Sequence, residues 1–205
     1  MSTGSSPDPR RVERLFGSEF GVAYTDRNAE VDARKPQFFH DLFAKHGISR
    51  LLECGSNRGL NLGLCAADPA MEVWGVDIQR AALSLAAQAM PKGNFVYGSL
   101  FDLPFKDNWF DIAFTCGVLI HVPPEGLGAA MDEMYRVSRG WILCAEYHDE
   151  REVEVPYRGL SGALWRRNYG AMWQERFPGL TLVDQGYKAP EEGFDRITWQ
   201  LLRKP

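Results

Sequence analysis

The sequence predicts an α/β fold in which a mostly parallel sheet is covered by helices on both faces. Short apolar runs alternate with helix-like segments from residue 38 to 146, which is typical of strands joined by right-handed crossovers. The first run, 51–54, leads into a turn with two glycines, and the second run, 72–77, ends in an acid. Glycine turns after a first strand are shared by many nucleotide binders, so the motifs that follow the turn decide its function.

The N-terminal region precedes this alternating pattern. Residues 1–9 are small and polar with two prolines, and they are expected to be disordered. Residues 10–35 are more charged, but Phe16, Phe20 and Tyr24 recur at helical spacing. The segment is either a helix that packs its aromatic face on the core, or a lid over the ligand with Tyr24 and Arg27 facing inward. The sequence leaves both interpretations open.

The expected helices and strands then follow in regular order. A helix over 36–46 ends at Gly47, a residue that favours a helix C-terminus, and a second helix, over 62–67, is stopped by Asp68-Pro69. A third helix is expected over 81–90, and Pro124 opens a fourth with a clear apolar stripe. Strands are expected at 51–54, 72–77, 94–97, 110–116, 141–146, 180–183 and 197–202. No internal repeat or domain boundary interrupts the pattern, so one domain over 1–205 is expected.

The composition argues against several classes of protein. A formal net charge of −4 disfavours broad nucleic-acid binding, and no apolar stretch approaches membrane-spanning length. No signal peptide leads the chain, so a cytoplasmic location is expected. The four cysteines form no Cys-x-x-Cys pair and are expected to be reduced core residues. The four histidines lack metal-ligand spacing, so no metal site is expected. The sequence leaves the oligomeric state open.

An acidic residue precedes the glycine turn. In Glu53-x-Gly55-x-x-x-Gly59 the carboxylate comes two positions before the first glycine. This carboxylate would repel a pyrophosphate bound at the next helix N-terminus, but not a ligand that carries an ammonium and a sulfonium. Asp77 lies about twenty residues further on, the separation expected of an acid that binds ribose hydroxyls. The turn therefore favours a cationic nucleoside over a dinucleotide.

A third motif, Leu103-Pro104-Phe105-x-Asp107-x-x-Phe110-Asp111, leads into the fourth strand. With the glycine turn and Asp77, it makes the chain resemble the class I methyltransferases that use S-adenosylmethionine. The resemblance implies a Rossmann-like seven-stranded sheet, mostly parallel with the last strand antiparallel between the fifth and sixth, and helices on both faces. It implies a cofactor site at Glu53, Gly55, Asn57, Gly59, Asp77, Ile78, Ser99, Leu100, Thr115 and Gly117, with Tyr24 and Arg27 added if residues 10–35 form a lid. Many members carry an acid where this chain has Ser99.

A narrower resemblance comes from motifs outside the glycine turn. Phe20-Gly21 with Tyr24-Thr25-x-Arg27-Asn28, Gly117-Val118-Leu119-Ile120-His121, and Glu146-Tyr147 with Tyr157-Arg158-Gly159 recur together. This set is similar to the methylases associated with pseudaminic acid biosynthesis, and to a phosphonate O-methyltransferase of the dehydrophos antibiotic pathway. The resemblance implies a small anionic acceptor.

Candidate acceptor residues lie in the segments after the fourth and fifth strands, because ligands of such sheets bind beyond the carboxyl ends of the strands. They are His121, Tyr147, His148, Tyr157, Arg158, Arg166 and Lys188, several of them in an acceptor-side insertion over 150–178. The arginines either pair two-point with phosphonate, phosphate or carboxylate oxygens, or form a solvated face. His121 is either a catalytic base or a residue of the cavity wall.

The sequence thus predicts an S-adenosylmethionine-dependent O-methyltransferase that acts on an anionic small molecule. A phosphonate in antibiotic biosynthesis is the expected acceptor. One alternative is a methylase that tailors an acidic sugar such as a nonulosonic acid, and another is a dinucleotide-binding oxidoreductase of the NAD type.

Overall fold

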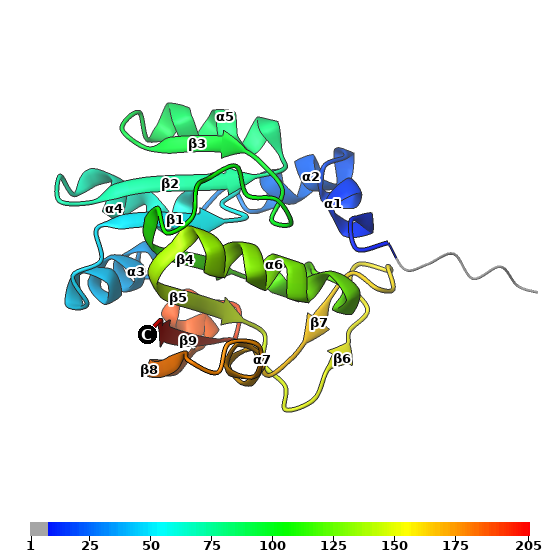
Figure 1. Ribbon diagram of the computed structural model, residues 1–205. Coiled ribbons are helices and arrows are strands. Elements are labelled where there is room, and N and C mark those ends of the chain that lie inside the picture. The colour runs from blue at the N-terminus through cyan, green and yellow to red at the C-terminus, as the bar shows by residue number, and fades with distance from the viewer. Residues whose placement is uncertain (1–7) are drawn as a thin grey trace, which may run out of the picture.

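The computed structural model describes residues 8–205, so the disorder expected for residues 1–9 falls almost entirely outside the described part of the chain. A seven-stranded sheet forms its centre, in the order β3-β2-β1-β4-β5-β9-β8 (Figure 1). The strands are β1 Arg50–Cys54, β2 Glu72–Asp77, β3 Asn94–Tyr97, β4 Phe110–Cys116, β5 Ser138–Glu146, β8 Thr181–Lys188 and β9 Ile197–Arg203. β1 to β5 pair in parallel, and β9 runs antiparallel between β5 and β8. The predicted fold class, including the inserted last strand, is confirmed.

The central strands are apolar because helices cover both faces of the sheet. From Phe110 to Thr115 every residue of β4 is buried. One apolar core joins β4 and β5 to α6 Pro124–Val137 and α7 Tyr169–Arg176, and a second core joins the other face to α3 Arg34–Lys45 and α4 Gly63–Ala67. α5 Arg80–Ala89 packs on β2 and β3. Such two-sided burial is what makes parallel strands nearly continuous apolar runs.

The aromatic segment near the N-terminus forms two helices rather than one. α1 Arg11–Phe16 and α2 Glu19–Arg27 are separated at Gly17 and Ser18. The break occurs because the Ser18 hydroxyl accepts a hydrogen bond from the amide of Phe20 and so caps a new helix. Phe16 still contacts Phe20 and Tyr24, with ring centroids 5.3 and 5.5 Å away. The helical spacing therefore predicted the contacts correctly, but not the break.

The insertion after β5 contains more regular structure than its sequence indicates. β6 Val153–Glu154 and β7 Trp165–Arg166 pair as a short hairpin, and α7 follows. Strands of two residues are too short to produce an alternating pattern, so sequence periodicity could not reveal them. In Figure 1 the loop between β6 and β7 comes close to α1, near the carboxyl ends of the parallel strands.

Three short 3-10 turns complete the connections: η1 Leu60–Leu62, η2 Leu119–His121 and η3 Pro190–Glu192. Within residues 8–205 no helix combines the length and the apolar character that a membrane span requires.

Candidate cofactor and acceptor site

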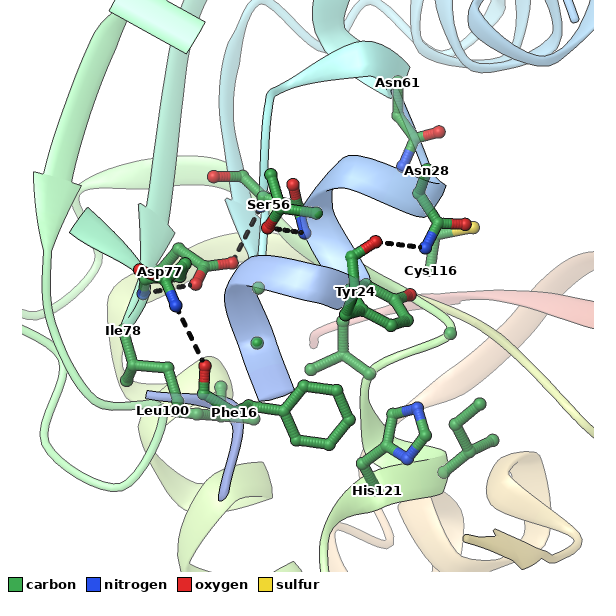
Figure 2. A pocket seen from close by; sticks show the side chains of 18 of the residues that line it. Phe16, Tyr24, Asn28, Ser56, Asn61, Asp77, Ile78, Leu100, Cys116 and His121 are labelled. Carbon is green, nitrogen blue, oxygen red and sulfur yellow. Dashed lines mark hydrogen bonds between the residues drawn. The ribbon is translucent and has the colours of Figure 1, made fainter. Parts of the chain in front are cut away.

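A cavity of about 660 Å³ lies at the carboxyl ends of the parallel strands and beneath α1 and α2 (Figure 2). This volume is within the range of small-molecule sites, roughly 300–1,000 Å³. Residues from both ends of the chain line it, because the turns after β1, β2, β3 and β4 meet there with the insertion and with the loop before β9. The predicted site residues that line the cavity are Tyr24, Arg27, Gly55, Asn57, Asp77, Ile78, Leu100, Gly117, His121, Tyr147, Tyr157 and Arg158.

The other predicted site residues do not line the cavity: Glu53, Gly59, Ser99, Thr115, His148, Arg166 and Lys188. Two of these side chains lie within ion-pair distance of another residue, and a third is exposed to solvent. Lys188 pairs with Glu192 at 2.6 Å, His148 lies 3.3 Å from Glu150, and Arg166 is exposed to solvent on β7. For these three the structure supports a surface position, and the sequence could not show which way each side chain points.

The glycine turn is shaped by packing as much as by the cavity. Gly55 has φ 73° and Gly59 has φ 69°, in the left-handed region where a side chain is strained. A Cβ on Gly55 would lie 2.6 Å from the side chain of Val118, and one on Gly59 would lie 2.5 Å from Met90. The two glycines therefore let neighbouring elements approach the turn closely. The sequence predicted that both glycines let a ligand approach the backbone closely. Of the two, only Gly55 borders the cavity.

Asp77 fixes the turn from the next strand. Its carboxylate accepts hydrogen bonds from the amides of Asn57 and Gln79, both at 2.7 Å. Burial raises the pKa of Asp77, and the two N–H donors oppose that rise. Each carboxylate oxygen has a second lone pair, so Asp77 can still accept from a diol. In Figure 2 Ile78 and Leu100 lie next to it and provide an apolar wall.

Glu53 lies fully buried at the end of β1. One of its oxygens accepts from the side-chain amide of Asn61 at 2.5 Å, and the other has no partner within residues 8–205. Burial raises the pKa of Glu53 to about 8, although Asn61 and Lys35 lower it. A buried carboxylate with one satisfied oxygen is costly, and a cation next to it would remove that cost.

Lys35 was missed by the sequence analysis. It projects from α3 into the cavity, where the charges of Cys116 and Glu53 raise its pKa. It forms no ion pair with any described residue. An ammonium that interacts electrostatically with a buried carboxyl group matches the zwitterionic tail of an amino acid. No spacing rule connects residues 35 and 53, because only the packing of α3 brings them together.

Two residues that line the cavity carry a buried polar atom without a partner within residues 8–205. These atoms are Ser56 Oγ and Asn57 Oδ1. Buried polar groups are normally satisfied, so unsatisfied ones along a cavity indicate that a polar ligand completes them. Figure 2 places Asp77 and Leu100 on one side of Tyr24, and Asn61 and Cys116 on the other. The residues present therefore fit a nucleoside at one end and an amino-acid tail at the other.

His121 lies in η2, next to the rings of Phe16 and Tyr157 at 4.7 and 5.0 Å. Its Nδ1 is 2.6 Å from the carbonyl oxygen of Ala163. A carbonyl only accepts, so Nδ1 carries the proton and Nε2 is left as the basic nitrogen. Burial lowers the pKa of His121 to about 4, against the opposing effect of the Ala163 bond. The imidazole is therefore neutral and weakly basic near pH 7.

The turn that carries His121 is fixed at both ends by buried charges. The Glu146 carboxylate accepts from the amides of residues 118, 119 and 120, each at 3.2 Å. The Arg167 guanidinium donates to the carbonyls of Leu119 and Val122, at 3.3 and 2.9 Å. This arrangement matches the turn's dipole, with the anion at its amino end and the cation at its carboxyl end. Arg167 is thus a structural residue, buried away from solvent.

Arg166 and Arg167 form a matched pair for testing this arrangement. Arg167→Met leaves the two carbonyls and Glu152 without their donor, so we expect a loss of about 2–4 kcal/mol of unfolding free energy. Arg166→Met alters an exposed side chain and should change stability by less than about 0.5 kcal/mol. Urea denaturation of both variants measures the difference, and equal losses would contradict the structural role of Arg167.

Glu53 predicts an unusual dependence of stability on pH. Its folded pKa of about 8 lies above the unfolded value of 4.5, so the folded state binds the extra proton between these values. Stability from this group is therefore present at low pH and lost as pH rises toward 8. Glu53→Gln should remove that loss, making the free protein roughly 2–4 kcal/mol more stable than wild type at pH 8 but not at pH 5. Denaturation at both pH values tests this, with Glu175→Gln on the exposed face of α7 as the control.

Comparisons with known proteins agree with this geometry. Residues 51–140 match a family model described as a methyltransferase domain. An uncharacterized methyltransferase of Schizosaccharomyces pombe is 33% identical over 111 residues, which cover 47% of this chain and 39% of the relative. The chain therefore aligns with well under half of that relative's length.

Two solved structures share the fold over nearly the whole chain. A Burkholderia thailandensis 1,6-didemethyltoxoflavin N1-methyltransferase, with its acceptor and S-adenosylhomocysteine bound, has a TM-score of 0.77 at 20% identity, covering 99% of this chain and 93% of the other. A Synechocystis magnesium protoporphyrin IX methyltransferase with bound S-adenosylhomocysteine has a TM-score of 0.72 at 15% identity, covering 97% and 100%. Residues 51–140 therefore resemble a methyltransferase domain, and the chain shares the fold of these two methyltransferases.

Proposed function

We propose that the chain transfers a methyl group from S-adenosylmethionine to an oxygen of a small anionic molecule. A phosphonate in natural-product (antibiotic) biosynthesis is the acceptor that we favour. The state of His121 is the observation that carries this proposal. A residue with a pKa of about 4 is a poor base for a neutral hydroxyl, whereas a phosphonate or carboxylate oxygen is already ionised and needs no base.

Two arginines support an anionic acceptor. Arg27 and Arg158 both line the cavity, and neither forms an ion pair with a described residue. Their guanidinium groups lie 6.0 and 5.9 Å from the rings of Phe20 and Tyr157, and these two rings contact each other at 6.4 Å. An acceptor that enters beside this aromatic pair therefore meets two cations able to bind its non-attacking oxygens.

The chain's own residues contribute alignment and exclusion of water. S-adenosylmethionine supplies an activated methyl group on its sulfonium when it is bound. α1 and α2 cover the cavity, and Tyr24 lies half-buried between its two ends, where partial burial raises its pKa. The aromatic wall of Phe16, Tyr157 and His121 confines the acceptor from a further side. Methyl transfer needs reacting atoms held in line, and such walls provide that geometry.

The two alternatives are less well supported by the cavity. A methylase for a sugar hydroxyl requires a base, and His121 is weakly basic. An oxidoreductase of the NAD type would place a pyrophosphate near the acidic side chains of Glu53 and Asp77, which offer it no positive charge. Labelling of a hydroxyl acceptor would reveal the sugar methylase, and binding of NAD would reveal the oxidoreductase.

The decisive assay follows transfer of labelled methyl from S-adenosylmethionine to a panel of phosphonates, carboxylic acids and sugar acids. Under the proposal, a phosphonate or carboxylate becomes labelled on oxygen, and His121→Ala keeps measurable turnover. Arg158→Ala should raise KM for the acceptor about tenfold or more, because one charge-assisted contact is lost.

Arg151→Ala is the matched control, since Arg151 is exposed on the same insertion and does not line the cavity. It should leave KM unchanged. Complete loss of turnover in a folded His121→Ala protein, or labelling of hydroxyl acceptors alone, would reject an ionised acceptor. Transfer to no acceptor, with binding of NAD instead, would reject the methyltransferase function.

A further inference from the structure

One end of the cavity is a mainly apolar slot between α1 and the turns after β2 and β3. Its walls include Val12, Ile78, Leu100 and Phe101. Val12 is 6% exposed, so α1 contributes to the interior and not only to an outer cover. An apolar slot next to the diol-binding Asp77 has the character required by a flat purine ring.

A single additional carboxylate enters this slot. Glu13 lines the cavity from α1, and its carboxylate accepts a hydrogen bond from the hydroxyl of Ser99 in the turn after β3. The Ser99 oxygen in turn accepts from the amide of Phe101 at 3.0 Å. The side chain of Glu13 is therefore oriented by the turn beneath it, and it has no ion pair with residues 8–205.

Other polar groups near the slot are already committed or lie elsewhere. The Gln79 amide donates to the carbonyls of Phe16 and Ser18, at 3.3 and 3.4 Å. Asp102 is exposed and does not line the cavity. The remaining acids of the lining belong to segments 28–32 and 193–195, outside α1 and these turns. Glu13 is thus the acceptor available to a donor on the rim of a ring in the slot.

We propose that Glu13 binds the exocyclic amine of the cofactor's adenine and makes α1 part of the nucleoside site. This inference rests on the proposed use of S-adenosylmethionine. Adenine carries one exocyclic amine, which can only donate, and a carboxylate is the strongest acceptor that a side chain offers. Glu13 reaches this slot from α1, and the hydroxyl of Ser99 in the turn after β3 donates to its carboxylate and so holds it there.

The position of Glu13 also connects the nucleoside to the acceptor side. Arg11, two residues earlier, donates to the carbonyls of Ser161 and Gly162 at 2.9 and 2.5 Å. These carbonyls belong to the loop between β6 and β7, which also carries Tyr157. Fixing α1 on the adenine therefore fixes a contact to the acceptor-side insertion as well.

The test compares the binding of two ligands by calorimetry. One is S-adenosylhomocysteine, and the other is its analogue with hydrogen in place of the 6-amine of the purine. Wild type should bind the adenine compound about 10- to 100-fold more tightly, the range for one hydrogen bond to a charged group. In Glu13→Ala this ratio should fall to near one, while the deaminated analogue binds nearly as well as it does to wild type.

Glu19→Ala in α2 is the matched control, because Glu19 is exposed, carries the same charge and does not line the cavity. It should keep the wild-type ratio. Ser99→Ala gives a second measure, with the ratio reduced about three- to tenfold through loss of the contact that orients Glu13. An unchanged ratio in Glu13→Ala, or an equal fall in Glu19→Ala, overturns the inference alone. Wild type that binds neither compound overturns the proposed function as well.

Discussion

Burial of carboxylates at the strand ends is the constraint on which the rest of the site depends. Glu53, Asp77 and Glu146 lie at or next to the ends of β1, β2 and β5; Glu53 and Glu146 are buried, and Asp77 is half-buried. A buried charge needs hydrogen-bond donors, and at these positions the donors are mostly backbone amides of neighbouring loops. Asp77 orders the glycine turn in this way, and Glu146 orders the turn that carries His121. Glu53 differs, because one of its oxygens finds no donor within residues 8–205.

The helices that cover the cavity attach to the loops that these carboxylates order. The Asn57 side chain donates to the hydroxyl of Thr25 in α2 at 3.1 Å, and Gln79 donates to carbonyls at the end of α1. The N-terminal segment is therefore bonded to the same turns that contact a ligand. The aromatic face of residues 10–35 packs inward and at the same time lines the cavity. Closure of this segment over a ligand stays a prediction. The proposed cofactor and acceptor regions would consequently share walls.

The basic side chains after β5 differ in whether they pair with other residues of the chain. Their positions in the sequence do not reveal this difference. Lys188 finds Glu192 four residues away, and Arg167 is used to bind backbone carbonyls. Arg158 has φ 51° and lines the cavity instead. A long cationic side chain can reach several partners from one backbone position. Which lysines and arginines pair with other residues, and which line the cavity, is therefore decided only when the chain folds. The lysine and arginines that line the cavity, Arg27, Lys35, Arg58 and Arg158, form no ion pair within residues 8–205, and they lie near an aromatic wall.

The sequence by itself determined where the seven strands lie along the chain, the glycine turn, and Asp77 at the next strand end, because these depend on local apolar runs and short spacings. The order of the strands in the sheet followed only from the family resemblance. The sequence also indicated the cofactor, since the carboxylate before the turn disfavours a phosphate. Tertiary structure alone decided the break between α1 and α2, the β6–β7 hairpin and the position of Lys35 in the cavity. It also brought Glu13 to Ser99 across 86 positions. These contacts join residues distant in the chain through packing of whole elements, and neither periodicity nor local motif spacing encodes the distance between such elements.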